Sequence, residues 1–454
     1  MTPTSAPLIA LQSPTDVSLG EVAAELNKIS TLYQAAGDDP SVAGTTRAAT
    51  FSLIVYEPSE TQQLLAELGY YTGPVDGIDG PRTKTAIQVA QKQFGLSVNG
   101  HPSAALLSRL REQLAERRSY DGPTDPLAQS YALDAVGAGV ADEVARQNPC
   151  RIIALCPISE STGGVTAQVS AYCPVLQQQQ SSLVCCEYIT LKGTDAELAT
   201  VSGFIQSLVI GELPKFLWWK AIPDLHHELF RKLSDFCNLV IVDSSTFEDA
   251  ETALLNIHDL HQKGINVADL NWRRLAVWQE LTAEAFDPPS RRAALNDVDR
   301  FVLDYEAGNS AQAFLFLGWL ASRLQWRPIA CHQDGGDYNL RNIQLVNADQ
   351  RPIEAELAAI PVADPGQVLG DLIDFKLAST NLEADCCTVI CSETRGCMRM
   401  EAGGGAQSCR VQHVSPLAEQ SPEALMSQQL QRWGRDLLFE ESLAVAVQVL
   451  QAKG

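Results

Sequence analysis

A chain of 454 residues, 45% of them hydrophobic, is long enough to form several domains that each bury a core of their own. Its 33 Lys and Arg residues against 55 Asp and Glu residues give a formal charge of -22, which would repel a polyphosphate backbone or an anionic membrane surface. We therefore expect neither nucleic acid nor a membrane as a partner. Residues 1–7 lack the basic and apolar regions of a secretory signal, so we expect a cytoplasmic protein.

The first 58 residues are predicted to form a helix and the first strand of an α/β domain. Apolar residues recur every three or four positions between Leu19 and Tyr33, which is the spacing of one helical face. The run Phe51–Tyr56 favours a strand that ends before Pro58. The next strand-like run, Arg151–Cys156, follows a predicted helix at 127–147. The segment between the two strands therefore contains an insertion.

The insertion, residues 59–118, carries the pattern of a small module of three helices, predicted at 60–68, at 81–94 and from Pro102 onward. Its glycines and aromatic residues, from Leu64 to Gly100, resemble those of the peptidoglycan-binding-like domain at nearly every turn position. The resemblance implies the fold of the module. We expect no cell-wall ligand, because a cytoplasmic chain does not meet cell wall and because turn glycines are explained by their backbone angles alone.

Residues 119–265 are predicted to complete the α/β domain. Strand-like runs at 150–156, 183–191, 213–219 and 239–243 alternate with helical segments. One of these helices is marked by the cap Pro223-Asp224 and by an apolar face that runs from Leu225 to Phe236. This alternation predicts a mixed-sheet α/β domain.

Residues 266–454 are predicted to be helical at first and β-rich afterwards. Helices are expected at 271–286, 298–306 and 311–324. Strand-like runs follow at 328–333, 340–347, 353–360, 372–378, 386–391, 397–401 and 408–414, which favours an antiparallel sheet. A last helix is expected from Ser421-Pro422, with Leu430, Trp433 and Leu437 on one face. The predicted class is therefore α/β plus α+β, with an antiparallel C-terminal domain closed by a helix.

The sequence contains none of the short motifs that mark common catalytic or cofactor sites. Glycine-rich phosphate loops, Gly-x-Ser-x-Gly, Ser-x-x-Lys, His-Glu-x-x-His and Cys-x-x-Cys are all missing. His258 and His261 have a spacing that could hold a metal ion, but surface residues of a helix are the better interpretation. We predict no catalytic residue, no cofactor and no metal site. An enzyme with an unrecognised active site is the alternative.

Two adjacent tryptophans, Trp218 and Trp219, end a predicted strand beside a proline turn. Successive side chains of a strand point to opposite faces, so both indoles cannot enter one core. Either both are packed between the sheet and its covering helices, or one lies at a surface and contacts a partner. Trp218 and Trp219 are therefore candidate interface residues.

Four segments of the α/β part resemble the OpcA family. They are Gln147–Ile153, Pro214–Pro223, Val240–Ser245 and Asp269–Arg274. The resemblance covers most of the chain and implies a non-catalytic protein that binds glucose-6-phosphate dehydrogenase and promotes its active oligomer in the oxidative pentose phosphate pathway. The inserted module and the cysteine-rich tail are similar to the form from oxygenic phototrophs, which implies redox-responsive activation with thioredoxin as a second partner. A generic protein-interaction scaffold and a cell-wall-binding module are competing interpretations.

The C-terminal cysteines form the predicted redox switch. Between Cys386 and Cys397 two β-rich stretches flank a polar turn, which is typical of a hairpin. Facing residues of a non-hydrogen-bonded antiparallel pair have Cα atoms about 4.5 Å apart, a separation that a disulfide can bridge. We therefore expect Cys391 and Cys397 to face each other and to form a disulfide. Cys386, Cys387 and Cys409 are alternative redox residues, and ordinary strand cysteines are the other interpretation.

Charged residues near this turn bear on how reactive the thiols are. Arg395 and Arg399 would favour the thiolate form of a neighbouring cysteine, whereas Glu393 would oppose it. The thiolate is the form that exchanges with a disulfide. The turn is therefore expected to contain reactive thiols.

Overall fold

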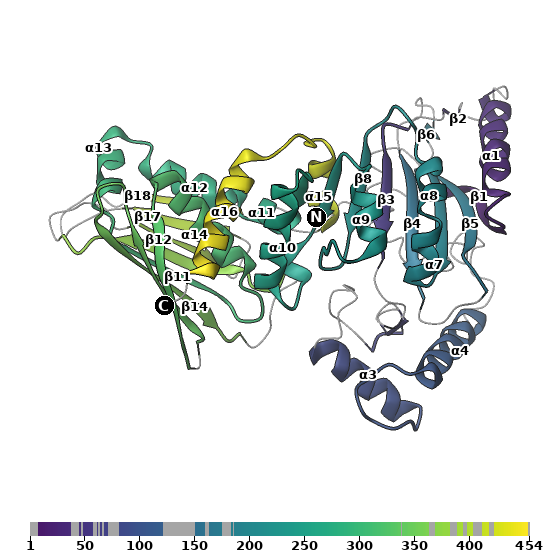
Figure 1. Ribbon diagram of the computed structural model, residues 1–454, viewed down its shortest axis with the longest axis horizontal. Helices are drawn as coiled ribbons and strands as arrows, with labels where there is room; N and C mark the ends of the chain where they lie inside the picture. Colours follow the sequence, from purple (N-terminus) through teal and green to yellow (C-terminus); the bar gives the residue numbers. More distant parts are fainter. Residues whose placement is uncertain are drawn as a thin grey trace. The chain divides into compact units, whose positions relative to one another are not determined.

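The computed structural model of the protein describes most of the chain. The described residues are 8–37, 45–46, 49–57, 61, 64–65, 68–70, 81–120, 150–158, 163–174, 183–184, 186–336, 338–362, 368–381, 388–393, 397–402, 411–416 and 422–452. They form two compact units, each with a large mixed sheet (Figure 1). Unit 1 comprises Met1–Val242 and Met426–Trp433, and unit 2 comprises Asp243–Leu425 and Gly434–Gly454. The class is mixed α/β, and the division lies within the segment 119–265.

The sheet of unit 1 contains a core of parallel strands. In spatial order the strands of this sheet that belong to unit 1 are β1 (Leu8–Val17), β5 (Thr166–Pro174), β7 (Cys186–Gly193), β4 (Arg151–Pro157), β3 (Ser52–Tyr56), β8 (Lys215–Trp219) and β9 (Leu239–Val242). The strands from β7 to β9 are parallel, and β5 and β1 are antiparallel to their neighbours. If the five parallel strands are numbered along the chain, their spatial order is 3-2-1-4-5, which is the order of doubly wound sheets.

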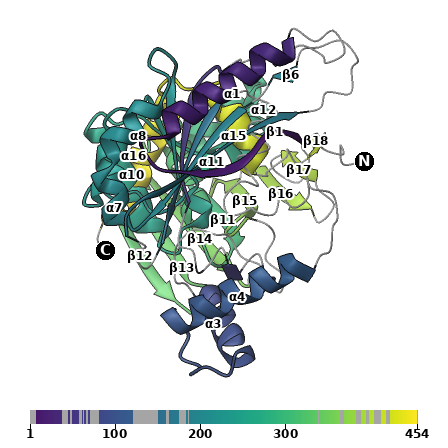
Figure 2. The same cartoon turned by 90° about the vertical axis from the view of Figure 1, so that its right-hand side faces the viewer.

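The parallel strands of unit 1 are buried on both faces. Leu53, Ile54 and Val55 have no exposed area, which explains why β3 reads as a continuous apolar run. The helices are α1 (Val22–Gly37), α7 (Asp195–Thr200), α8 (Ser202–Leu208) and α9 (Glu228–Ser234). α7 packs on β4 and β7 and α9 on β8, while α1 packs against β5 near the β1 edge (Figure 2). A short parallel pair joins β2 (Thr45–Thr46) to β6 (Leu183–Val184).

The sequence-based strands at 51–56, 150–156, 213–219 and 239–243 are confirmed, but β1 and β5 were missed. β1 contains Pro14, which argues against a central strand. Among the described strands β1 pairs only with β5, so it lies at the edge of the sheet, where a proline is tolerated.

The inserted module contains α3 (Pro81–Gln93) and α4 (Ala104–Tyr120). Its core is a cluster of small and branched apolar residues, namely Leu64, Leu65, Ala86, Ile87, Ala90, Leu106, Leu107, Leu110 and Leu114. Gln91 fixes the turn between the helices: its Nε2 donates to Asn99 Oδ1 at 2.8 Å and to the His101 carbonyl at 2.9 Å, and its Oε1 accepts from Gly100 N at 3.0 Å. The predicted helix at 60–68 lies largely outside the described residues, as does the one at 127–147.

Unit 2 is built on an eight-stranded sheet in the order β12-β13-β14-β11-β15-β16-β17-β18. Its strands are β11 (Arg300–Glu306), β12 (Arg327–Gly335), β13 (Leu340–Val346), β14 (Pro352–Ile360), β15 (Leu372–Ala378), β16 (Thr388–Glu393), β17 (Cys397–Ala402) and β18 (Val411–Pro416). β11 is parallel to β14, whereas the other neighbouring pairs are antiparallel. The predicted antiparallel sheet is therefore mixed.

The predicted helix at 298–306 is wrong, because this segment is strand β11. Phe301, Leu303 and Tyr305 are buried while the residues between them are not, which is a period of two. The predicted helix at 311–324, by contrast, is present. Inserting β11 between β14 and β15 is also what makes the sheet mixed.

Helices cover one face of the sheet of unit 2 (Figure 1). Unit 2 contains α10 (Ala250–Gln262), α11 (Leu270–Arg274), α12 (Ala276–Phe286), α13 (Pro289–Arg292), α14 (Ala311–Leu324) and α16 (Leu437–Gln451), the short strand β10 (Val267–Asp269), and the 3-10 turns η1 (Ser244–Thr246) and η2 (Ala293–Asp297). Phe316 of α14 lies 4.8 Å from Phe375 of β15, measured between ring centroids. Among the described helices none is long and apolar enough to cross a bilayer.

The predicted closing helix is two helices. α15 (Pro422–Leu430) ends before Trp433, and α16 begins at Leu437. Asp436 caps α16 by accepting a hydrogen bond from Phe439 N at 3.1 Å, so the chain restarts a helix there rather than continuing one. Trp433 is 47% exposed and Leu437 63%, which excludes the shared apolar face that the sequence predicted.

Gly318 lets α14 and α16 approach closely, and we predict that a methyl group there destabilises the fold. A Cβ at Gly318 would collide with the Ser442 carbonyl oxygen and would lie 3.1 Å from the Ala446 Cβ. Gly318→Ala should lower the free energy of unfolding by about 1–3 kcal/mol, measured by denaturant titration. Gly203→Ala in α8, where a Cβ meets nothing within 4 Å, is the control and should be neutral or slightly stabilising. Equal effects of the two substitutions would contradict this packing argument.

Candidate functional site

Both candidate interface tryptophans are buried. Trp218 is 3% exposed and Trp219 is 1% exposed. Trp219 stacks on Tyr56 with ring centroids 3.8 Å apart and packs edge-on against Phe230 at 4.9 Å. Lys220 Nζ lies 4.4 Å from the ring centroid of Trp218. In this conformation neither indole offers area to a partner, so a contact role would require unit 1 to open.

The stacked rings lie where doubly wound sheets bind their ligands. Such sheets bind at the carboxyl ends of the strands, between the first and fourth strands in chain order. Here those strands are β3 and β8, and their last residues, Tyr56 and Trp219, are register partners. The next residues, Glu57 and Lys220, form an ion pair. The protein's own aromatic and paired charged side chains therefore occupy this position.

Tyr56 is held by a half-exposed carboxylate. Its Oη donates to Asp195 Oδ1 at 2.9 Å, and His227 Nε2 lies 3.7 Å from the same oxygen. Burial and then the charge of Asp195 raise the pKa of Tyr56, so the phenol stays protonated. Burial opposes ionisation of Asp195, but the hydrogen bonds from His227 and Tyr56 outweigh it and lower the pKa of that carboxyl. Asp195 and His227 therefore hold Tyr56 in its stacked position on Trp219 and do not form a general base.

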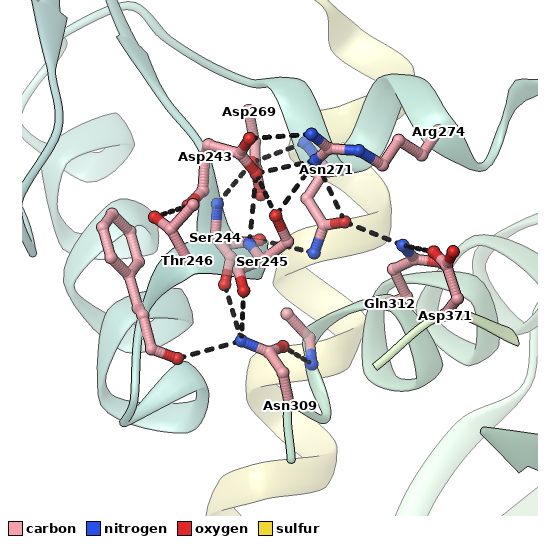
Figure 3. A network of polar contacts seen from close by, with 12 residues as sticks. Asp243, Ser244, Ser245, Thr246, Asp269, Asn271, Arg274, Asn309, Gln312 and Asp371 are labelled. Carbon is pink, nitrogen blue, oxygen red and sulfur yellow. Dashed lines mark hydrogen bonds and ion pairs between the residues drawn. The ribbon is translucent and has the colours of Figure 1, made fainter. Parts of the chain in front are cut away.

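A buried polar cluster in unit 2 is built around Arg274 and Asp243 (Figure 3). Arg274 donates from NH1 to Asp243 Oδ1 at 2.7 Å and from NH2 to Asp243 Oδ2 at 2.8 Å. Ser245 Oγ donates to the same Oδ1 at 2.6 Å. Burial opposes ionisation of Asp243, but Arg274 outweighs it and lowers the pKa of that carboxyl. A bidentate pair of this kind fixes orientation as well as charge.

Asp269 is the second buried carboxyl of this network. Its Oδ1 accepts from Ser244 N and from Asn271 N, each at 2.9 Å. Its Oδ2 is buried and has no hydrogen-bond partner within the described part of the chain. Burial and then the charge of Asp243 raise the pKa of Asp269 to about 6. Asp269 is thus the titratable member of the cluster near neutral pH.

Two amide side chains extend the network to other elements (Figure 3). Asn309 Nδ2 donates to the carbonyls of Ser244 and Phe247, each at 2.9 Å. Gln312 Nε2 donates to Asn271 Oδ1 at 2.9 Å and to Asp371 Oδ1 at 2.7 Å. The sequence analysis missed both amides. The signal for Gln312 was a polar residue in the first turn of an otherwise apolar helix, which is buried only when it is hydrogen-bonded.

Asp243, Ser244, Ser245, Asp269, Asn271 and Arg274 all belong to the segments that carry the family resemblance. Both carboxylate oxygens of Asp243 are taken by Arg274, and the amide groups are taken by backbone and side-chain partners. The arrangement can position the elements that it joins. It offers no paired acid and base with a reacting atom between them.

The two histidines considered as metal ligands lie on α10. His261 Nε2 is 3.1 Å from the Val267 carbonyl, and its ring packs edge-on against Phe439 with centroids 5.5 Å apart. Burial lowers the pKa of His261. Within the described residues no group of three or more metal-ligating side chains is present.

The cysteine hairpin lies at β16 and β17, and its register differs from the expected one. Cys391 is opposite Arg399, and Cys397 is opposite Glu393. The two cysteines are therefore offset by two positions and do not face each other. Diagonal positions are about 7–8 Å apart, whereas disulfides usually join Cα atoms within about 6.8 Å. Cys386, Cys387 and Cys409 lie outside the described residues.

Other cysteines are poorly suited to exchange. Cys150, directly before β4, and Cys186, the first residue of β7, are 2% and 1% exposed and hydrogen-bond to each other. Burial, and then this hydrogen bond, raise the pKa of Cys150. Burial raises the pKa of Cys237 to about 12, and it raises that of Cys331 although Arg341 opposes it. The thiols of Cys150, Cys237 and Cys331 are therefore protonated at neutral pH, and the thiolate is the reactive form.

We predict that Asp269→Asn stabilises the protein at neutral pH. An acid whose folded pKa is raised to about 6 contributes stability that is fully present below about pH 4 and is lost as the pH rises through about 6. Asparagine keeps an acceptor for Ser244 N and Asn271 N but carries no charge. The variant should gain up to about 3 kcal/mol at pH 7.5 and little at pH 4. Thermal denaturation across this pH range measures the difference.

The matched control is Asp349→Asn, which changes an exposed carboxylate outside the network. It should reproduce the pH dependence of the unsubstituted protein. If Asp269→Asn shows that same dependence, Asp269 is not the titrating group.

Comparison with known proteins gives the family. Residues 141–259 and residues 265–443 match the models for the N-terminal and the C-terminal domain, respectively, of the "Glucose-6-phosphate dehydrogenase subunit", and residues 57–110 match "Putative peptidoglycan binding domain". A curated relative from Nostoc punctiforme, "Putative OxPP cycle protein OpcA", is 53% identical over 98% of this chain and 95% of its own. Relatives with the same name from Synechocystis sp. and Synechococcus elongatus are 50% and 48% identical, over 98% and 99% of this chain and 94% and 99% of theirs.

Solved structures add little. A 3-ketoreductase from Actinomadura kijaniata is 9% identical with a TM-score of 0.37, over 54% of this chain and 78% of that one. Levoglucosan dehydrogenase is 10% identical with a TM-score of 0.35, over 54% and 78%. Likenesses this weak carry no argument. The near full-length relatives and the two matches to domains of the glucose-6-phosphate dehydrogenase subunit agree with the resemblance of the segments that build the buried network. The chain therefore belongs to the OpcA family of glucose-6-phosphate dehydrogenase assembly proteins.

Proposed function

We propose that this protein binds glucose-6-phosphate dehydrogenase, promotes its active assembly as an allosteric activator, and catalyses no reaction itself. The observation that carries the proposal is the pair of dehydrogenase-associated domains matched at 141–259 and 265–443. The family segments supply a buried scaffold in which Arg274 donates hydrogen bonds to both Asp243 and Asn271. A scaffold of this kind supports a binding role, because it positions elements without presenting a reactive group.

The ligand position of the doubly wound sheet supports the same conclusion. Tyr56 stacks on Trp219 there and Glu57 pairs with Lys220, so packed side chains take the place that a dinucleotide occupies in related topologies. The chain also lacks the glycine-rich turn that brings a backbone close to a pyrophosphate. An enzyme that uses such a cofactor is therefore the weaker alternative.

The inserted module is part of the proposal as a protein-contact or packing element. Its core is made of aliphatic residues, while Val89 and Val98 are 49% and 55% exposed. Exposed valines suit a contact with another protein surface and do not indicate a carbohydrate site by themselves. We expect no cell-wall ligand.

Thioredoxin control through Cys391 and Cys397 is the regulatory part of the proposal, with Cys386, Cys387 and Cys409 as alternatives. Reduction is a thiol–disulfide exchange: a thioredoxin thiolate attacks the disulfide, a mixed disulfide forms, and the second thioredoxin thiol resolves it. The protein gains two thiols and thioredoxin gains one disulfide. The raised pKa values of Cys150, Cys237 and Cys331 favour the C-terminal cysteines as the responsive ones.

The diagonal offset suits a switch. Because Cys391 and Cys397 are two register positions apart, closing the bond requires the β16–β17 hairpin to shift its backbone. Oxidation would therefore change the shape of the hairpin more than the stability of the fold, since the closed loop is short. Any partner that contacts the hairpin would sense this change.

The test is a binding and activity assay with purified dehydrogenase. The unsubstituted protein should form a complex by light scattering and raise dehydrogenase activity, and oxidation should alter the activation. Cys391→Ser and Cys397→Ser should each abolish the redox response while leaving the melting temperature within a few degrees of the original. Cys237→Ser, which removes a thiol of raised pKa, is the control and should retain the response.

Two results would contradict the proposal at different levels. If no complex forms at micromolar concentration and the kinetics are unchanged in either redox state, the assembly role is wrong. If the complex forms but both serine variants retain redox sensitivity, the redox residues must instead be sought among Cys386, Cys387 and Cys409. Retained sensitivity with all five cysteines replaced would exclude the tail as the switch.

A further inference from the structure

The sheet of unit 2 has one covered face and one open face. Phe301, Leu303 and Phe375 point to the covered face, where they are buried under α12 and α14. The alternate positions of β11, β14 and β15 form the opposite face and are largely half-buried or exposed. We call this the open face. Its charged residues in these three strands are Arg300, Asp304, Glu306, Glu354, Glu356, Asp374 and Lys376, and its apolar positions include Val302, Ala358 and Ala378.

The open face is acidic. Five of its seven charged residues are Asp or Glu and two are Arg or Lys, a larger acidic excess than the 55 to 33 ratio of the whole chain. One cation, Arg300, is already paired with Glu354 at 2.9 Å. Glu356 and Lys376 lie on either side of Val302 in the same transverse row. The remaining field of this face is negative.

Asp304 and Asp374 oppose each other directly across β11 and β15. Like charges at facing positions are unfavourable in a sheet. Burial raises the pKa of both carboxyls, and the charge of Asp374 raises that of Asp304 further. Within the described residues neither carboxylate directly faces a cation in this row, because the β14 neighbour of Asp304 is Ala358 and the β16 neighbour of Asp374 is Cys391. A cationic group from outside would relieve the repulsion.

The same row leads to the cysteine hairpin. Asp374 is opposite Cys391 in β16, and Cys391 is opposite Arg399 in β17. Cys397, the first residue of β17, lies two positions before Arg399 along the same strand and is opposite Glu393. A shift of the β16–β17 hairpin would therefore move strands that are directly hydrogen-bonded to the acidic rows.

From this alignment we infer that the open face is the surface that docks glucose-6-phosphate dehydrogenase, through a Lys- and Arg-bearing patch of the enzyme set against Asp304, Asp374 and Glu356. The inference rests on the proposed function and assigns its contact surface. The hairpin extends the same sheet, so its redox state alters the edge of the docking face rather than a distant element.

Charge variants with opposite signs test the assignment. Glu356→Lys should weaken the dehydrogenase complex by about tenfold or more in Kd at low salt, and Lys376→Glu should strengthen it or speed association. Both effects should shrink as ionic strength rises. Glu280→Lys is the control, because it makes the same charge change on α12, on the covered side of the sheet. It should leave Kd unchanged, and thermal denaturation should show all three variants folded.

The outcomes separate this inference from the proposed function. If the unsubstituted protein forms no complex, both are wrong. If the complex forms and Glu356→Lys binds as tightly as Glu280→Lys does, the dehydrogenase docks elsewhere and only the surface assignment is wrong. If Lys376→Glu weakens binding while Glu356→Lys strengthens it, the facing patch is acidic and the inference is overturned.

Discussion

The buried ion pair between Arg274 and Asp243 is the constraint on which unit 2 depends. Asp243 directly follows the apolar strand β9, and Arg274 ends α11, so the pair joins two positions 31 residues apart. Removing one partner would leave the other as an isolated buried charge, which typically costs about 3–5 kcal/mol. Asn309 and Gln312 then attach the start of α14 to the same cluster. Separate backbone segments are thus held by one set of interlocked polar groups.

The sequence contained the participants of this cluster but not their pairing. Resemblance pointed to the segments that contain Asp243, Asp269 and Arg274, and local spacing could not show that Arg274 reaches back to Asp243. Gln312 could have been suspected, because a polar residue in an apolar helix needs a partner. Asn309 could not, since its three carbonyl acceptors lie in a 3-10 turn and loop that only the tertiary fold brings near.

Strand type and register were harder to predict than strand existence. The runs at 51–56, 239–243 and 353–360 were read correctly because burial on one or both faces leaves a clear apolar pattern. Strand β11 was predicted as a helix because its alternating pattern is short and the helical pattern of α14 follows it closely. The register of β16 against β17 depends on how many residues the turn uses, and the residues themselves allow several turn lengths.

The two-position offset of Cys391 and Cys397 gives the redox proposal its physical content. A facing pair would bridge with little movement, so oxidation would leave the sheet almost unchanged. A diagonal pair cannot close until the hairpin slides or twists, and β16 is hydrogen-bonded to β15 along the row that contains Asp374. Closing the bond therefore displaces β16, which is paired with strand β15 of the open face. Formation of the disulfide at the turn would thus shift the charged side chains of the open face. Binding through an interface of complementary charges depends on the positions of such side chains.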